Sequence, residues 1–166
     1  MNLSFRFANE GDLPVIFDLY KRGVEGMQKA GIDQWDNEYP NEQTITEDVE
    51  NGHLHLCICE GKIAAAFALN CEVEEEYETA NWENPEAHFI AMHRLCVSPD
   101  FQRRGIGRAC MLEIERFAKE NGFDAIRLDT FTKNTKALPM YESLGFKAVG
   151  EAFWSKGRFI IFEKNL

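Results

Sequence analysis

The chain has 166 residues, of which 45% are hydrophobic, and this size suits one globular domain spanning residues 1–166. It carries 28 acidic and 18 basic residues, a formal net charge of -10, so its field repels nucleic acid and no such partner is expected. No apolar run approaches the roughly 18 residues that span a bilayer. The first residues also lack the basic segment followed by an apolar segment that is typical of a signal peptide. We therefore expect no membrane association and a cytoplasmic location.

The first half of the chain predicts a strand, two helices and a hairpin. Apolar and polar residues alternate over residues 3–7, and an apolar stripe at helical spacing continues to about residue 29. Thr44 and Glu47 have the spacing of a capping box, which indicates a short second helix. The remaining elements are strands at 53–59 and 63–69, a turn at 60–62 and a solvated acidic connection at 72–78.

The second half alternates strands with helices. Pro139 is comfortable only in a first helical turn, so the helix expected around 134–144 starts a few residues after Asn134 or bends. The predicted order implies an α/β (α+β) fold, with helices on both faces of a mixed, mostly antiparallel sheet of about seven strands. The other elements are strands at 88–97, 125–131, 146–153 and 159–163, and an amphipathic helix over 106–117.

A glycine-containing turn joins the strand ending at Val97 to the amphipathic helix. Free N–H groups at a helix start can bind a pyrophosphate, and glycines let phosphates approach the backbone. The turn lacks the three glycines of a dinucleotide fingerprint and the Gly-Lys-Ser/Thr of a P-loop, so NAD and ATP are not expected to bind. Tight packing of the strand on the helix would also explain the glycines. The turn contains Gln102, Arg103, Arg104, Gly105, Ile106, Gly107 and Arg108.

Two segments of the chain resemble the GNAT family of N-acetyltransferases. Residues 102–107, QRRGIG, resemble the family's acetyl-CoA-binding motif Q/R-x-x-G-x-G/A, and residues 134–146 are similar to its segment N-x-x-A-x-x-x-Y-x-x-x-G-F. The close match covers roughly residues 90–150, whereas the first half agrees only in the order of its elements. The resemblance implies an acyl-CoA N-acyltransferase fold, an acetyl-CoA cosubstrate and direct transfer of acetyl to a primary amine of a small molecule or peptide.

The resemblance also implies which residues bind the cosubstrate. The backbone of residues 103–108 would wrap the pyrophosphate, and Asn134 and Tyr141 would reach the pantetheine and the thiol end. Backbone groups of Leu95, Cys96 and Val97 would contact the pantetheine.

Acyl transfer needs a neutral amine and a proton for the departing thiolate. A phenol with a pKa of about 10 can donate to a thiolate of pKa about 8.5, and the resemblance gives this role to Tyr141. His93 lies on the strand before the turn, where parts of the family carry a base or water-orienting residue. Packing in the core or at its rim would explain both side chains as well, and Glu72 remains a further candidate base.

The amine acceptor is the part that the sequence does not identify. Trp35, Asp36, Glu38 and Tyr39 fall in a region that lines the acceptor pocket in similar enzymes, and their aromatic faces and carboxylates suit an ammonium group. A loop held on the core by Trp35 is the alternative explanation. A non-catalytic acyl-CoA sensor, or an acetyltransferase acting on protein N-termini or lysines, is also compatible with the motif, and a homodimer is possible.

Metal and disulfide chemistry are not expected. His53, His55, Cys57 and Cys59 alternate along one strand, but same-face neighbours are roughly 6.6 Å apart, so the four span about 20 Å and cannot converge on one ion. The five cysteines lie mostly in apolar runs, as buried free thiols do.

Overall fold

Seven strands form one sheet in the order β1-β2-β3-β4-β5-β7-β6 in the computed structural model, which describes all residues from 1 to 166. Strands β1 and β2, β2 and β3, β5 and β7, and β6 and β7 pair in antiparallel fashion, whereas β4 and β5 are parallel. This confirms the predicted mixed, mostly antiparallel sheet and the predicted order of helices and strands. The chain divides into a first unit, residues 1–69 and 93–113, and a second unit, residues 70–92 and 114–166.

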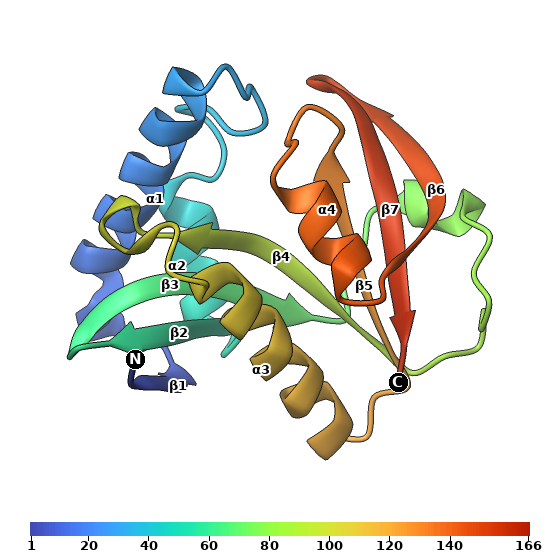
Figure 1. Ribbon diagram of the computed structural model, residues 1–166, viewed down its shortest axis with the longest axis horizontal. Coiled ribbons are helices and arrows are strands. Elements are labelled where there is room, and N and C mark those ends of the chain that lie inside the picture. Colours follow the sequence, from blue (N-terminus) through green and yellow to red (C-terminus); the bar gives the residue numbers. More distant parts are fainter. The chain divides into compact units, whose positions relative to one another are not determined.

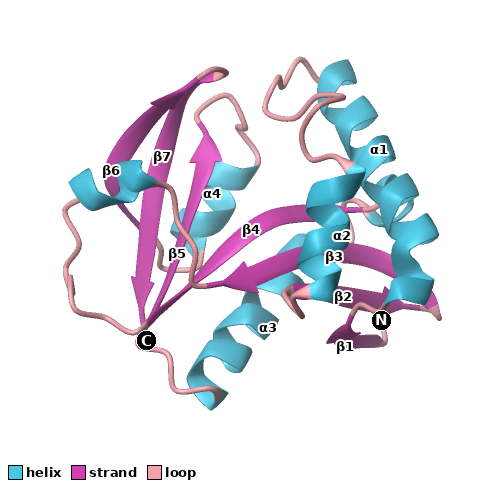
Figure 2. Cartoon of the chain, turned by 180° about the vertical axis from the view of Figure 1, so that it is seen from behind, coloured by secondary structure: helices cyan, strands magenta, loops and turns pink.

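In the first unit, two helices cover one face of an antiparallel set of strands (Figures 1 and 2). Ile16, Leu19 and Tyr20 of the first helix are buried in one core cluster with Leu54 and Leu56. Burial of these side chains, rather than helix propensity, holds the helices on the sheet. The elements are β1 (Leu3–Phe7), α1 (Leu13–Lys29), α2 (Glu42–Glu50), β2 (Leu54–Cys59) and β3 (Lys62–Asn70).

Strand β4 (Phe89–Val97) leads into the glycine-containing turn. It pairs in parallel with β5 over Phe89–Ala91. A short 3-10 helix, η3 (Pro99–Phe101), follows the strand, and the buried Ser98 begins it by accepting the N–H of Asp100. Helix α3 (Ile106–Glu120) begins within the 102–108 segment, so residues 106–108 form its first turn.

In the second unit, α4 and η2 pack on opposite faces of the β5-β7-β6 strands (Figures 1 and 2). The ring of Tyr141 on α4 contacts Phe162 of β7, whose Cα partner on β5 is Leu128. Tyr77 of η2 instead bonds Asp129, the next residue of β5, which points to the other face. The elements are the 3-10 helix η2 (Glu75–Thr79), β5 (Ala125–Phe131), α4 (Ala137–Ser143), β6 (Lys147–Trp154) and β7 (Gly157–Asn165).

The structure differs from the sequence at two places, the start of α2 and the acidic run, and it decides between the two alternatives for α4. Helix α2 begins at Glu42, before the predicted capping box, because Asn41 is the cap and accepts the N–H of Thr44 at 2.9 Å. The acidic run is not simply a solvated connection, since η2 buries Tyr77. Helix α4 starts at Ala137, which places Pro139 in its first turn.

None of the helices combines the length and the apolar composition that a membrane span requires. The five cysteines are free thiols, and all except Cys71 are buried. No group of three or more His, Cys, Asp or Glu side chains is arranged to hold a metal ion.

Candidate functional site

The turn at residues 102–108 presents its backbone rather than its side chains. Arg103 has a φ of 63° and Gly105 a φ of 77°, while Arg104 between them is not in the left-handed region. Such alternation turns successive N–H groups toward one concave side, and the first N–H groups of α3 have no partner within the helix. A Cβ on Gly105 would meet no atom within 4 Å, so the space beside this backbone is open.

The arginines of the turn are not equivalent. Arg104 forms an ion pair with Glu60 at 2.8 Å and lies over the ring of Phe101, with 5.1 Å between the guanidinium carbon and the ring centroid. The bond to Glu60 raises the pKa of Arg104, and the ion pair is partly exposed. The charge of Arg104 is therefore already paired, and its side chain joins the turn to Glu60. Arg103 and Arg108 are exposed on the same turn. An anion here would meet the backbone first and these guanidinium groups second.

Cys96 of β4 packs inward, between two half-buried neighbours, Leu95 and Val97. Gly23 of α1 makes this approach possible, because a Cβ there would lie 2.5 Å from Cys96 Sγ. Burial raises the pKa of the Cys96 thiol to about 12, so it stays protonated and is no nucleophile at neutral pH. Cys96 therefore supplies no reactive thiol here, and the contact of Leu95, Cys96 and Val97 with pantetheine that the resemblance implies would involve their backbone groups.

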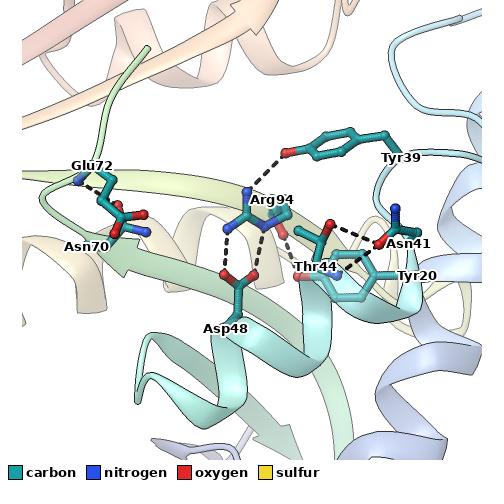
Figure 3. Close-up of polar contacts among 8 residues, drawn as sticks. All are labelled: Tyr20, Tyr39, Asn41, Thr44, Asp48, Asn70, Glu72 and Arg94. Atoms are coloured by element: carbon teal, nitrogen blue, oxygen red, sulfur yellow. Dashed lines mark hydrogen bonds and ion pairs between the residues drawn. The ribbon is translucent and has the colours of Figure 1, made fainter.

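Arg94 is the centre of a polar network that the sequence did not reveal (Figure 3). Its guanidinium donates two hydrogen bonds to Asp48 of α2, at 2.7 and 2.8 Å, and one to the hydroxyl of Tyr39 at 3.0 Å. Burial alone would lower the pKa of Arg94, but the bonds to Asp48 and Tyr39 raise it overall. Its backbone has a φ of 56°, and its carbonyl accepts the hydroxyl of Tyr20 at 2.7 Å. The network thus fixes a strained point of β4.

His93 directly precedes this strained residue and is half-buried on β4. It belongs to the first unit with the glycine-containing turn and Leu95–Val97. The other candidate base, Glu72, is exposed, and its backbone N–H donates to the side chain of Asn70 at 3.0 Å (Figure 3).

The predicted acceptor segment has one buried and several accessible members. Trp35 lies in the core, 5.8 Å from the ring of Tyr20, so it fastens the loop to the core as the alternative explanation proposed. Asp36 accepts the N–H groups of Glu38 and Tyr39, while Tyr39 is 44% exposed.

Beside this segment is an open groove of about 750 Å³ between α1 and residues 36–45. Its lining includes Asp18, Glu25, Asp36 and Glu42, with Lys21 as its one basic residue.

Tyr141 lies in the second unit and combines a packed ring with an unused hydroxyl. The residue is 5% exposed, and its ring contacts Phe146 and Phe162 with centroid separations of 5.9 Å. No hydrogen bond of the protein involves its hydroxyl, and the hydroxyl oxygen is not a fully buried unpartnered atom, so it remains accessible. Burial, and then the charge of Asp129, raise the pKa of Tyr141 well above its ordinary value. The phenol stays protonated and can donate to a ligand.

Asn134, also in the second unit, has a local structural role. Its side-chain oxygen accepts the N–H of Ala137 at 3.3 Å, and its carbonyl accepts the same N–H at 3.2 Å. Asn134 therefore precedes α4 and supports its first turn, rather than standing two helical turns before Tyr141 on the same helix.

Asp129 is a titratable residue that the sequence reasoning missed. Tyr77 donates its hydroxyl to Asp129 Oδ2 at 2.6 Å. Burial raises the pKa of Asp129 to about 6, the bond from Tyr77 opposes this rise, and the charge of Glu74 adds to it. The available signal was a carboxylate inside an otherwise largely apolar strand, β5.

Comparison with known proteins places these features in a family. A model of the acetyltransferase (GNAT) family matches residues 18–146, a stretch that includes the turn, Asp129 and Tyr141.

Among relatives, the [ribosomal protein bS18]-alanine N-acetyltransferase of Escherichia coli is 28% identical over 116 residues, covering 69% of this chain and 70% of that protein. Human N-acetyltransferase 8 is 32% identical over 65 residues, covering 39% of this chain. The chain spans only 29% of the length of that human protein.

Solved structures show the same fold over nearly the whole chain. A GNAT-family acetyltransferase of Streptococcus agalactiae has a TM-score of 0.86 at 24% identity, with 99% of this chain and 95% of that chain covered. The PaiA N-acetyltransferase of Thermoplasma acidophilum, solved in complex with coenzyme A, has a TM-score of 0.73 at 18% identity, with both chains fully covered.

Proposed function

The chain belongs to the GNAT acetyltransferase family, and from this premise we propose that it transfers the acetyl group of acetyl-CoA directly to a primary amine. The observation that carries the proposal is the 102–108 turn, whose two left-handed residues and helix start present N–H groups beside open space. We further propose that residues 1–166 act as one domain, because the family match runs through residues of both units.

The pyrophosphate of acetyl-CoA binds the backbone of residues 103–108, with Arg103 and Arg108 adding positive charge. The pantetheine contacts the backbone of Leu95–Val97, and Asn134 lies along the same cosubstrate. A cosubstrate of this kind is supported by the coenzyme A complex of the Thermoplasma enzyme, which shares the fold. The backbone N–H groups bind the phosphates without needing any particular side chain.

Replacement of Gly105 by valine tests this binding site. The left-handed conformation is costly for a β-branched residue, about 1–3 kcal/mol, and the new side chain would enter the open space where phosphates must approach. We expect acetyl-CoA affinity, measured by calorimetry, to fall at least about tenfold, equivalent to about 1.4 kcal/mol.

Gly122→Val is the matched control, because Gly122 has a φ of 79°, equally open surroundings and a position at the other end of α3. Both variants carry the same backbone strain, but only Gly105→Val should lose affinity. Equal affinities of the two variants would contradict the placement of the pyrophosphate.

In the transfer step, the neutral amine attacks the thioester carbon, a C–N bond forms and the C–S bond breaks. Tyr141 gives its phenolic proton to the departing CoA thiolate, a role supported by its protonated state and unused hydroxyl. His93 orients the acceptor or the water that relays its proton, as residues of this strand do in parts of the family.

The acceptor is a cationic amine of a small molecule or a peptide. The net charge of -10 and the carboxylates of the groove beside residues 36–45 favour such a ligand over an anionic one. We include a peptide N-terminus among the candidate acceptors, because the E. coli relative is named an alanine N-acetyltransferase of a ribosomal protein.

Thiol release from acetyl-CoA tests the function. The panel contains a peptide with an N-terminal alanine, a lysine-containing peptide blocked at its N-terminus, spermidine and an aromatic ethylamine. We expect amine-dependent release of CoA with at least one of them. Tight acetyl-CoA binding without release for any amine would favour the non-catalytic sensor instead.

A further inference from the structure

We propose that Arg94 sets the width of the acceptor groove by bonding both of its walls, and that it thereby acts as a positioning residue that selects among amines. The inference rests on the proposed function, which assigns the groove beside residues 36–45 to the acceptor. It adds a residue that neither the motif nor the comparisons assign. Arg94 and both walls belong to the first unit.

The first wall of the groove is helix α1, which Arg94 holds through its backbone. The ring of Tyr20 lines the groove beside Phe17 and Val24. Tyr20 is 2% exposed, and its hydroxyl donates to the carbonyl of Arg94 at 2.7 Å (Figure 3). A side chain of the groove wall is therefore fixed to β4, at the residue whose backbone has a φ of 56°.

The second wall is the loop that leads from Asp36 into α2, which Arg94 holds through its side chain. Arg94 Nη1 donates to the hydroxyl of Tyr39 at 3.0 Å (Figure 3), and Tyr39 stands between Asn37 and Pro40, which both line the groove. Asp36 accepts the N–H of Tyr39, and its own N–H donates to the carbonyl of Tyr39, both at 3.0 Å. These local bonds make the loop compact, so the bond from Arg94 positions it as a unit.

The guanidinium of Arg94 is itself held, so its bond to Tyr39 has a fixed direction. Nε and Nη2 donate to the two carboxylate oxygens of Asp48 at 2.8 and 2.7 Å, a paired geometry that fixes the plane of the group. Tyr39 is 44% exposed, and an exposed hydroxyl can bond water instead, so the third bond adds little to stability. Its main consequence is the position of the loop.

The charges of the groove make its width important. Carboxylates stand on both walls, Asp18 and Glu25 on α1 and Asp36 and Glu42 on the other side. Like charges repel, so the walls need a contact that holds them together. The carboxylates attract any ammonium group and do not select one amine. A slender polyamine contacts both walls of a narrow groove, whereas a bulky aromatic amine needs them further apart, so selection depends on the width that Arg94 fixes.

Tyr39→Phe tests the proposal, because it removes the hydroxyl that Arg94 bonds and keeps the exposed ring. With the panel amine that is turned over fastest, we expect the KM of the amine to rise about tenfold, while kcat and acetyl-CoA affinity change by less than about twofold. A loosened wall also admits chains of different bulk. The kcat/KM values of the panel amines should therefore become more alike.

A double-mutant cycle shows whether Arg94 acts through Tyr39. Lysine keeps the charge beside Asp48 but lacks the planar group that bonds Asp48 twice and Tyr39 once. Arg94→Lys should raise the KM of the amine as Tyr39→Phe does, and the two changes together should raise it no further. Arg6→Lys is the matched control, since Arg6 donates to both oxygens of Asp12, at 2.8 and 2.9 Å, outside the groove. Its kinetics should match the wild type.

Hydrogen exchange provides a readout that needs no substrate. The N–H groups of Glu38 and Tyr39 donate to Asp36 at 2.8 and 3.0 Å, so they exchange when the loop opens. Tyr39→Phe releases the loop from Arg94 and should speed exchange at these two amides about tenfold. The amides of β2 and β4 should keep their wild-type rates.

Loss of the proposed function and loss of this inference give different results. If the wild type releases no CoA with any amine, the function is wrong, and calorimetry with spermidine in the presence of CoA tests Arg94 alone. Equal spermidine affinities of the wild type and Tyr39→Phe, or no binding to either, would overturn the inference. If the wild type is active, an unchanged KM in Tyr39→Phe, or a rise by the same factor for every amine, would show that Arg94 does not set the width. Tyr39→Phe alone decides if Arg94→Lys fails to fold.

Discussion

Tyr141→Phe should lower kcat by about 10² to 10⁴ with little change in acetyl-CoA affinity. Phenylalanine keeps the ring that packs on Phe146 and Phe162 and removes only the hydroxyl, which bonds no group of the protein. General acid catalysis contributes 10² to 10⁴ to rates, and the thiolate would lose its proton donor. Because no internal hydrogen bond is lost, the variant should unfold at nearly the same urea concentration as the wild type.

The measurement is steady-state kinetics under conditions where chemistry limits turnover, together with calorimetry for acetyl-CoA. Because burial raises the pKa of Tyr141 above its ordinary value of about 10, the wild-type rate should not fall below that pH through loss of the phenolic proton. If Tyr141→Phe turns over at the wild-type rate, Tyr141 is a packing residue and the thiolate leaves unassisted or with help from water.

The second large effect concerns stability. Asp48→Ala should destabilise the protein by about 3–5 kcal/mol, because it leaves the guanidinium of Arg94 buried without its carboxylate. The side chains of this ion pair are 12% and 8% exposed, so water cannot replace the lost partner. The strained backbone of Arg94 would also lose the anchor that joins β4 to α2.

Urea denaturation measures this change, with Glu47→Ala as the control. Glu47 precedes Asp48 on the same helix but is exposed, and its side chain meets only the neighbouring Gln43. The control should change stability far less, as solvent-exposed positions do. Equal effects of the two substitutions would mean that the Arg94 network adds nothing beyond the helix itself.

The fold could be predicted from the sequence where local pattern and burial agree. The apolar stripe ending near Lys29 predicted α1, and the glycine-containing turn predicted the start of α3. Pro139 indicated that α4 starts after Asn134, which the structure confirms. These features depend on residues close in the chain, so short-range rules are sufficient.

Parts of the candidate site could not be predicted because they depend on contacts between distant residues. Asp48 and Arg94 are 46 positions apart, and Tyr77 and Asp129 are 52 apart. Nothing near Tyr77 in the acidic run indicates that its ring is buried, and nothing near Asp129 indicates a tyrosine partner. The cap at Asn41 was missed because Thr44 and Glu47 also fit a helix start, and only the structure shows which side chain accepts.

Direct transfer of acetyl from acetyl-CoA to an amine can be tested in one reaction. The enzyme, acetyl-CoA and the best panel amine are mixed, and released thiol, acetylated amine and acetylated protein are quantified together by mass spectrometry. We predict equal amounts of thiol and acetylated amine, and no acetylated protein at any time. Thiol released without acetylated amine, or an acetyl group carried by the protein before it reaches the amine, would exclude direct transfer.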